Sequence, residues 1–396
     1  MSEKGTKGKE GIKVGTKRFF VLLAVFLLVG LFSAQMAAAS GGWLEDSANP
    51  VFDPVQKAYY PCVLYDANKF SSHGDAYYYK MWYSTGSTLR LAYSNDGKSW
   101  VEQDGDLSVL TNLNHPVVLF DVNGFGGGIY YKVWYWDSAS EYSNPIRYAE
   151  SSDGINWVND QAIWQDPSAL LVVGWVSPYW FYSSYGAGAV LYNAAGHATI
   201  NYGDPMGNKY VMYYDAASQG YAPDGTTEGT ALAFSADGIY WARYGSEPVL
   251  KASGGSAWDS KYAYAWSVLK INGQYEMYYS GGQLASNDGI GYAQSADGIA
   301  WTKQVNPIMH VSDGITWRSE RTYTPSVVYD ANQFSSNGDT AFFKMWYTGK
   351  SGSNYAIGYA STPSILVTPE NPFGVLAILF ACALAFTVVK LRKKKP

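Results

Sequence analysis

The sequence predicts an all-β protein, a five-bladed β-propeller with four antiparallel strands in each blade. A motif of the form Ser-x-Asp-Gly-x-x-Trp recurs four times, at 94–100, 151–157, 235–241 and 295–301. An aromatic strand precedes each copy and appears a fifth time at 344–347. No sustained helical periodicity occurs between the two ends of the chain. Short strands that recur at one period indicate a closed array of like units.

Each repeat has the pattern of four strands. An inner strand of alternating apolar residues comes first, as in 61–65, and the aromatic strand second, as in 80–83. A third strand, as in 89–93, leads to the Asp-Gly pair. Asp-Gly forms a tight hairpin because Gly accepts positive φ and Asp tolerates it. The repeats cover residues 50–103, 110–160, 163–246, 256–304 and 317–361.

The fifth repeat is incomplete, because no Asp-Gly hairpin and no outer strand follow its third strand. The segment 49–52 (Asn-Pro-Val-Phe) resembles 306–309 and 247–250, which end other repeats. We therefore expect the N-terminal strand to complete the last blade, since closure removes exposed strand edges. The predicted propeller spans residues 44–362.

The two ends of the chain are predicted to be export and anchoring segments. Residues 1–39 have a basic lead, an apolar run and small residues at a cleavage site, which is typical of a signal peptide whose core is helical. An uncleaved anchor is the alternative. Residues 363–372 are a linker with a sorting motif, and the stretch Pro-Glu-Asn-Pro-Phe-Gly at 369–374 resembles an archaeal sorting signal. Residues 373–390 are expected to form a transmembrane helix, and 391–396 a basic cytoplasmic tail. The protein is expected outside the cell, anchored to the membrane.

Charge and cysteine content narrow the possible partners. Without the two tails, the chain has 17 Lys and Arg against 31 Asp and Glu. Such an acidic domain is a poor partner for nucleic acid or anionic lipid. The two cysteines are Cys62 and Cys382, and the second lies in the apolar C-terminal run, so no disulfide is expected within the propeller.

The repeated unit resembles the five-bladed propeller of the arabinanase, β-xylosidase and levanase superfamily of glycoside hydrolases, over residues 49–361. In that family, three carboxylates project from the inner strands into an axial funnel. The resemblance implies a surface-anchored propeller that binds or hydrolyses extracellular polysaccharide. One carboxyl group would donate a proton while another attacks or activates water. A non-catalytic structural or adhesion propeller of the cell surface is the competing hypothesis.

Three carboxylates are the candidate catalytic residues. Asp53 resembles the first-blade aspartate of the family, and a turn residue is the alternative. Asp259, in Trp-Asp-Ser, is expected to point towards the funnel, and a loop cap is the alternative. Glu320 lies between two arginines that would lower its pKa, which suits a base, and a surface ion pair is the alternative. The second and third repeats have no matching carboxylate, which slightly favours a binder or a degenerate enzyme.

Further residues are candidates for substrate binding. Two histidines lie just before or at the start of inner strands, and two arginines lie at the start of the fifth repeat. An aromatic insert in the third repeat offers rings on which sugars stack. These candidates are His115, His197, Trp175, Trp180, Tyr182, Arg318 and Arg321. Packing against a blade edge is the alternative for the insert.

No cofactor is expected, and a Ca²⁺ site is the one metal hypothesis. The loops 65–75 and 329–339 share an Asp-Ala-Asn start and a Gly-Asp end, which could offer oxygen ligands to Ca²⁺. Repeats share turn chemistry in any case, so the hairpin interpretation is favoured.

Overall fold

The computed structural model describes residues 42–362 except for 71–75, 106, 108–109, 111, 141–145, 166–185, 198–207, 218–227, 246 and 284–287. Trp43–Thr362 form one compact unit. The predicted signal peptide, linker, transmembrane helix and basic tail lie outside the described residues. Within those residues no helix is long and apolar enough to cross a bilayer.

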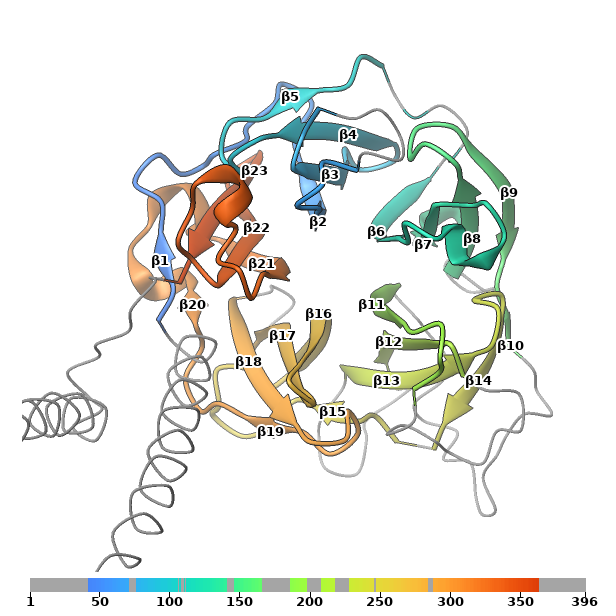
Figure 1. Cartoon of the computed structure of the whole chain (residues 1–396). Helices are drawn as coiled ribbons and strands as arrows, with labels where there is room; N and C mark the ends of the chain where they lie inside the picture. The colour runs from blue at the N-terminus through green and yellow to red at the C-terminus, as the bar shows by residue number, and fades with distance from the viewer. Residues whose placement is uncertain are drawn as a thin grey trace, which may run out of the picture. The chain divides into compact units, whose positions relative to one another are not determined.

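Five sheets of mainly antiparallel strands stand side by side around a common axis, which confirms the predicted five-bladed propeller (Figure 1). Blade 1 contains β2 (Tyr59–Tyr65), β3 (Tyr79–Ser84), β4 (Leu89–Ser94) and β5 (Val101–Glu102). Blade 2 contains β6 (Leu113–Phe120), β7 (Tyr131–Asp137), β8 (Ile146–Ser151) and β9 (Trp157–Ala162). The first strand of each blade is the innermost one.

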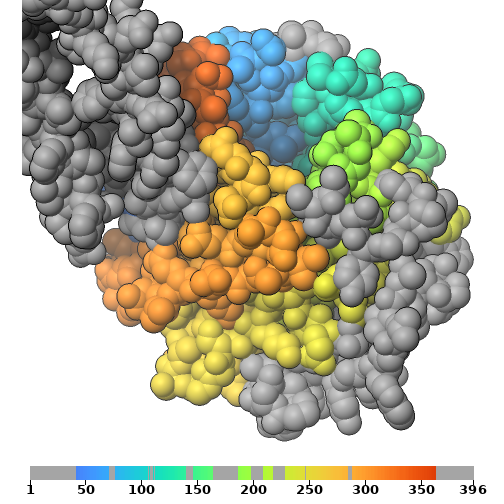
Figure 2. All heavy atoms as spheres, turned by 60° about the horizontal axis from the view of Figure 1, so that its bottom comes forward, coloured from blue at the N-terminus to red at the C-terminus, as the bar shows by residue number. Residues whose placement is uncertain are grey.

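Blades 3 and 4 carry short additional strands at their outer edges. Blade 3 contains β11 (Ala187–Tyr192), β12 (Tyr210–Ala217), β13 (Glu228–Ser235) and β14 (Tyr240–Tyr244), with β10 (Trp164–Gln165) and β15 (Leu250–Lys251) added. Blade 4 contains β16 (Tyr262–Ile271), β17 (Gln274–Gly282), β18 (Gly289–Ser295) and β19 (Thr302–Lys303), with β20 (Met309–His310) added. Figure 2 shows blade 4 near the viewer, between blade 5 and blade 3.

Blade 5 is closed by the N-terminus of the propeller. Its own strands are β21 (Arg321–Tyr329), β22 (Phe343–Ser351) and β23 (Asn354–Ser361), and the fourth is β1 (Leu44–Glu45). Leu44 pairs with Ser361 in antiparallel register. The sequence predicts the closing strand at 49–52, where the structure has only an isolated bridge between Phe52 and Ile357. The closing strand lies earlier because Glu45 is held by two side chains of blade 5, the guanidinium of Arg318 at 2.5 Å and the phenol of Tyr347 at 2.6 Å.

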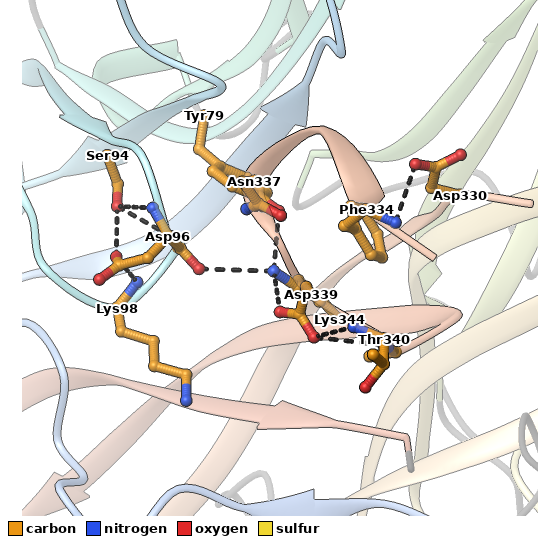
Figure 3. Close-up of polar contacts among 12 residues, drawn as sticks. Tyr79, Ser94, Asp96, Lys98, Asp330, Phe334, Asn337, Asp339, Thr340 and Lys344 are labelled. Atoms are coloured by element: carbon orange, nitrogen blue, oxygen red, sulfur yellow. Dashed lines mark hydrogen bonds and ion pairs between the residues drawn. The ribbon is translucent and has the colours of Figure 1, made fainter. Parts of the chain in front are cut away.

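The Asp-Gly hairpins share one hydrogen-bond pattern, drawn for blade 1 in Figure 3. The hydroxyl of Ser94 accepts the backbone N–H of Gly97 at 2.8 Å and donates to the carboxylate of Asp96 at 2.9 Å. The same carboxylate oxygen accepts the N–H groups of Lys98 and Ser99, both at 2.7 Å. These backbone hydrogen bonds lower the pKa of Asp96, against the opposing effect of burial. The motif aspartate is therefore occupied by turn chemistry.

Each hairpin also fastens its blade to the preceding one. The indole N–H of Trp82 in blade 1 donates to the carbonyl oxygen of Gly154 in blade 2 at 2.9 Å, and Trp134 of blade 2 does the same to Gly238 of blade 3 at 2.8 Å. A Cβ at Gly154 would lie 2.8 Å from the ring of Trp82. The glycine is required both for its positive φ and for this close approach.

The seam between blades 4 and 5 has no hairpin, and the ring of Trp43 lies there instead. It contacts Tyr278 of blade 4 edge-on, with centroids 5.7 Å apart, and Phe343 of blade 5 at 6.3 Å. Trp43 directly precedes β1. The N-terminal segment thus supplies both the outer strand and the aromatic contact that the fifth repeat lacks.

Buried lysines form a second type of seam contact. Lys344 is fully buried, pairs with Asp339 at 2.6 Å and donates to the phenol of Tyr79 in the next blade at 2.8 Å (Figure 3). Its ammonium group lies 4.7 Å from the centroid of the Phe334 ring. The N–H of Phe334 is bound in turn by Asp330 at 3.0 Å.

In the two loops of the Ca²⁺ hypothesis, carboxylate oxygens of the first aspartate already accept hydrogen bonds from backbone N–H groups of their own turn. Asp66 accepts the N–H groups of Asn68 at 3.0 Å and Phe70 at 2.7 Å, as Asp330 does in its own loop. No cluster of three or more His, Cys, Asp or Glu able to hold a metal occurs in the part of the chain that the structure describes. Residues 71–75 of the first loop lie outside that part.

Candidate functional site

The inner strands bend near their first residues, at the end of the ring where they begin. Tyr60, His115 and Thr324 all have positive φ, between 53° and 54°, and each is followed by proline. A register shift interrupts pairing with the second strand at each of these positions. Bulges of this kind aim side chains away from the regular pleat. Three blades therefore use the same distortion at equivalent places.

Hydroxyl groups of the preceding blade hold two of these bends in place. Thr348 of blade 5 accepts the N–H of Tyr60 in blade 1 at 3.0 Å, and Ser280 of blade 4 accepts the N–H of Thr324 in blade 5 at 2.8 Å. A non-glycine residue at positive φ costs free energy, which such contacts offset. The bent positions are thus rigidly supported.

Four side chains meet at the ring axis and are called here the axial cluster: Tyr60, His115, Trp266 and Tyr323. Tyr60 lies 3.9 Å from His115, 5.7 Å from Trp266 in a stacked arrangement, and 5.9 Å from Tyr323, between ring centroids. These residues come from blades 1, 2, 4 and 5. Because rings from non-adjacent blades touch, the cluster occupies the axis itself. Tyr60 and Trp266 are half-buried.

Blade 3 contributes two carboxyl groups beside this cluster. Asp215, near the end of β12, is 1% exposed. Glu228 is the first residue of β13 and lies two residue pairs from Asp215 along the ladder between β12 and β13. The backbone N–H of Asp215 donates at 3.1 Å to Gly186, and a Cβ on Gly186 would lie 2.9 Å from the ring of His115. Asp215 also acts electrostatically on Tyr60. Asp215 therefore lies directly behind the axial cluster.

Burial controls the protonation of both acids. It raises the pKa of Asp215 well above the usual value, and the charge of Glu228 adds to the shift. Burial raises the pKa of Glu228 to about 7. One oxygen of Asp215 has no hydrogen-bond partner among the described residues. A carboxylic acid that keeps its proton can donate as well as accept a hydrogen bond, and a group that titrates near pH 7 suits proton transfer.

Sequence reasoning missed Asp215 and Glu228, although an alignment of the repeats contains a signal. In each blade, one aromatic residue of the second strand faces the next blade. Asp215 lies two residues after that aromatic residue in blade 3. The corresponding residues in other blades are Ser84, Trp136, Ser280 and Thr348. Three of these are small hydroxyl residues that fasten blades together. An aspartate at such a place is exceptional, and its neighbours bury it.

Two of the substrate-binding candidates from the sequence lie at this end of the ring. His115 belongs to the axial cluster. Arg321, the first residue of β21, is half-buried, and its charge counters the burial that raises the pKa of Tyr60 and of Tyr323.

Arg318 and Asp259 occupy equivalent places in blades 5 and 4 with opposite charge. Asp259 is 2% exposed and accepts hydrogen bonds from Lys303 of the outer strand at 2.7 Å and from Tyr279 at 3.0 Å. Arg318 is 1% exposed and binds Glu45 of the outer strand. The charge reverses because the outer strand carries lysine in one blade and glutamate in the other. Both side chains thus have structural partners that tie an outer strand to its blade.

The other candidates are dispersed. Asp53 is exposed, with Asn354 3.4 Å away. Glu320 is exposed, pairs with Lys350 and accepts the N–H of Gly352 at 2.7 Å, contacts that lower its pKa. No hydrogen bond or ion pair joins any two of the described residues Asp53, Asp259 and Glu320.

His197 is buried in the hairpin after β11, at the opposite end of that strand from the axial cluster. Burial lowers its pKa, and the charge of Lys270 acts in the same direction. Trp175, Trp180 and Tyr182 of the predicted aromatic insert lie outside the described residues.

Comparison with solved structures shows the same fold in carbohydrate-active proteins. A putative glycoside hydrolase from Bacteroides ovatus has a TM-score of 0.55 at 14% identity, covering 84% of this chain and all of that one. A thermostable family-43 glycoside hydrolase has a TM-score of 0.51 at 15% identity, covering 80% and 92%. An N-acetylgalactosamine deacetylase from F. plautii, in complex with blood group B trisaccharide, has a TM-score of 0.52 at 16% identity, covering 82% and 93%. No family model and no curated protein matches the chain.

Proposed function

We propose that this protein binds a glycan at the axial cluster, outside the cell, and is held at the cell surface by its C-terminal apolar run. The observation that carries the proposal is the convergence of Tyr60, His115, Trp266 and Tyr323 on the axis, from four blades. Sugar rings present apolar C–H faces that stack on aromatic rings, and phenols and indoles also hydrogen-bond to hydroxyl groups. Half-buried Tyr60 and Trp266 offer both kinds of contact.

The acids of blade 3 lie behind this surface. Burial raises the pKa of Asp215 well above its usual value, which favours the protonated form. A protonated carboxyl group can donate one hydrogen bond and accept another. Solved structures with this fold include proteins that act on or bind glycans, which is consistent with a carbohydrate ligand.

Hydrolysis is a second candidate function, and Glu228 is the observation that favours it. A carboxyl group with a pKa of about 7 is partly protonated at neutral pH and can serve as a general acid. Burial raises the pKa of both acids, so neither is a strongly ionised base or nucleophile. Glycoside hydrolysis needs a second carboxylate in that role. Binding is therefore better supported than hydrolysis.

A glycan array with the intact propeller tests the binding function. Retention of a defined group of glycans supports the proposal, and retention of none supports the competing structural or adhesion role. Chromatography of each bound glycan after long incubation then separates binding from hydrolysis. If the protein is a hydrolase, products appear with the wild type and disappear with Glu228→Gln, which keeps the shape of the side chain. Fractionation of cells with an antibody to the propeller tests the predicted surface location.

A further inference from the structure

Thr348 lies between the backbones of two tyrosines of the axial cluster. Within blade 5 it is the register partner of Tyr323, on the paired strands β22 and β21. Towards the next blade, its hydroxyl oxygen accepts the backbone N–H of Tyr60 at 3.0 Å. The two tyrosine rings meet edge to face, with centroids 5.9 Å apart and planes at 89°. A single residue thus links the segments that carry both rings.

Hydroxyl groups continue from Thr348 to the bend of its own blade. The hydroxyl oxygens of Thr348 and Thr324 lie 2.7 Å apart, so one of the two groups donates to the other. Thr324 directly follows Tyr323, and its N–H donates to the hydroxyl of Ser280 in blade 4 at 2.8 Å. Ser280, Thr324 and Thr348 are called here the hydroxyl chain, and each is at most 1% exposed. The chain connects blades 4, 5 and 1.

The backbone that the hydroxyl chain supports is strained. Tyr60 has a φ of 53° and Thr324 a φ of 54°. Positive φ is unusual for a bulky residue and rarer still for a β-branched one such as threonine. Strained residues of this kind persist where surrounding contacts fix them, and they gather at ligand-binding sites. The two bends therefore depend on the hydroxyl groups that bind their N–H groups.

The seam between blades 1 and 2 accommodates the same bend differently. His115 has a φ of 53°, but Ser84, the equivalent of Thr348, donates to the carbonyl oxygen of Leu113 at 3.0 Å and contacts the side chain of Asn114 at 3.0 Å. In the part of the chain that the structure describes, a hydroxyl group of the preceding blade binds the bent N–H in blades 1 and 5. Those two blades contribute the tyrosines of the axial cluster.

We infer that Thr348 is a positioning residue of the glycan site, whose buried hydroxyl group fixes the spacing and tilt of Tyr60 and Tyr323. The inference rests on the proposed glycan-binding function and adds the residue that pre-organises its aromatic surface. A sugar ring gains contact from an aromatic face only at a suitable tilt. Rings that are already fixed in that tilt lose less conformational freedom on binding, which raises affinity.

Thr348→Val tests the inference, because it removes the hydroxyl group and keeps the branched shape of the side chain. The probes are arabinohexaose, xylohexaose and a levan hexamer, with every further glycan that the wild type retains on the array. We expect the affinity for each bound probe to fall about fivefold or more. Thr348→Ser keeps the hydroxyl group and should restore the wild-type affinity. Hydrogen exchange at the N–H of Tyr60 should be faster in Thr348→Val and normal in Thr348→Ser.

Ser151→Ala is the matched control. Ser151 is fully buried, and its hydroxyl oxygen accepts the N–H of Gly154 at 2.8 Å. It lies opposite Tyr131 in the register, at the far end of blade 2 from His115. Ser151→Ala should therefore lower the melting temperature, as Thr348→Val does, and leave the affinity for every probe unchanged.

The outcomes separate this inference from the function on which it rests. Wild-type affinity in Thr348→Val, no recovery in Thr348→Ser, or an equal loss of affinity in Ser151→Ala overturns the inference and leaves glycan binding intact. Failure of the wild type to retain any glycan overturns both. If Thr348→Val does not fold, Ser280→Ala decides the question, because it removes the hydroxyl group that binds the other bend. A severalfold loss of affinity in Ser280→Ala then supports the inference, and an unchanged affinity overturns it.

Discussion

The indole N–H of Trp346, in the last blade, donates to the carbonyl oxygen of Gly97, in the first blade, at 2.6 Å. It is the ring-closing member of the series formed by Trp82 with Gly154 and Trp134 with Gly238. The first hairpin and the last aromatic strand are 249 positions apart in sequence and in direct contact. The repeated motif therefore acts as a joint between blades, and its strength can be measured at this seam.

Gly97→Ala should destabilise the propeller by about 2–4 kcal/mol. The new Cβ would lie 2.7 Å from the ring of Trp346, which adds an overpacking cost to the strain of positive φ. Gly105→Ala is the matched control, because Gly105 has nearly the same φ of 81° and a Cβ added there would meet no atom within 4 Å. We expect the control to cost only about 1 kcal/mol. Urea unfolding of both variants measures the difference, and equal losses would show that the joint carries no packing energy.

Arg318→Met should destabilise the propeller by about 3 kcal/mol, because it leaves Glu45 without its guanidinium partner and removes hydrogen bonds to Asp313 and the carbonyl of His310. Lys251→Met, which breaks the exposed pair with Glu247, should cost less than about 1 kcal/mol. Thermal unfolding compares the two variants. A loss at Arg318 no greater than at Lys251 would contradict the role given to β1 in closing the ring.

Because of Glu276, the free energy of unfolding of the propeller should fall as the pH rises from about 4.5 to 7. It is 2% exposed, and burial raises its pKa to about 7, so in this range the unfolded chain loses a proton that the folded chain keeps. The free energy of unfolding then falls by up to about 1.4 kcal/mol per pH unit and levels off above pH 7. Glu228 contributes a slope of the same sign.

Glu276→Gln should reduce this slope and stabilise the protein at pH 8. Urea unfolding at a series of pH values measures both effects. Glu247→Gln is the control, because its exposed carboxylate is paired only at the surface, and it should leave the slope unchanged. A slope that is the same in Glu276→Gln as in the wild type would rule out the buried glutamate as its source.

The fold was predictable because the joints between blades are local motifs. Ser94, Asp96 and Gly97 bind one another within four residues, so the hairpin is visible as a sequence pattern each time it recurs. The position of the closing strand was less predictable. It depends on Glu45, whose partners Arg318 and Tyr347 lie far along the chain. The similarity of 49–52 to other strand ends indicated the right blade and the wrong residues.

The site was less predictable than the fold, because it depends on which polar side chains are buried and on which residues from different blades come together. Asp259 and Arg318 look unusual in sequence, and each has a blade-internal ion pair in the structure. Asp215 looks ordinary until its strand position is compared with Ser280 and Thr348 in other blades. The axial cluster joins residues more than 200 positions apart, such as Tyr60 and Trp266, which no local pattern relates.

The affinity of Trp266→Ala for the glycan that the wild type binds best tests glycan binding at the axial cluster most directly. Loss of the ring should weaken binding at least tenfold, about 1.4 kcal/mol, in isothermal titration calorimetry, with the fold confirmed by circular dichroism. Tyr240→Ala, which removes a tyrosine that is 61% exposed on the outer strand of blade 3, should bind as the wild type does. Unchanged affinity in Trp266→Ala, or an equal loss in Tyr240→Ala, would contradict binding at the axis.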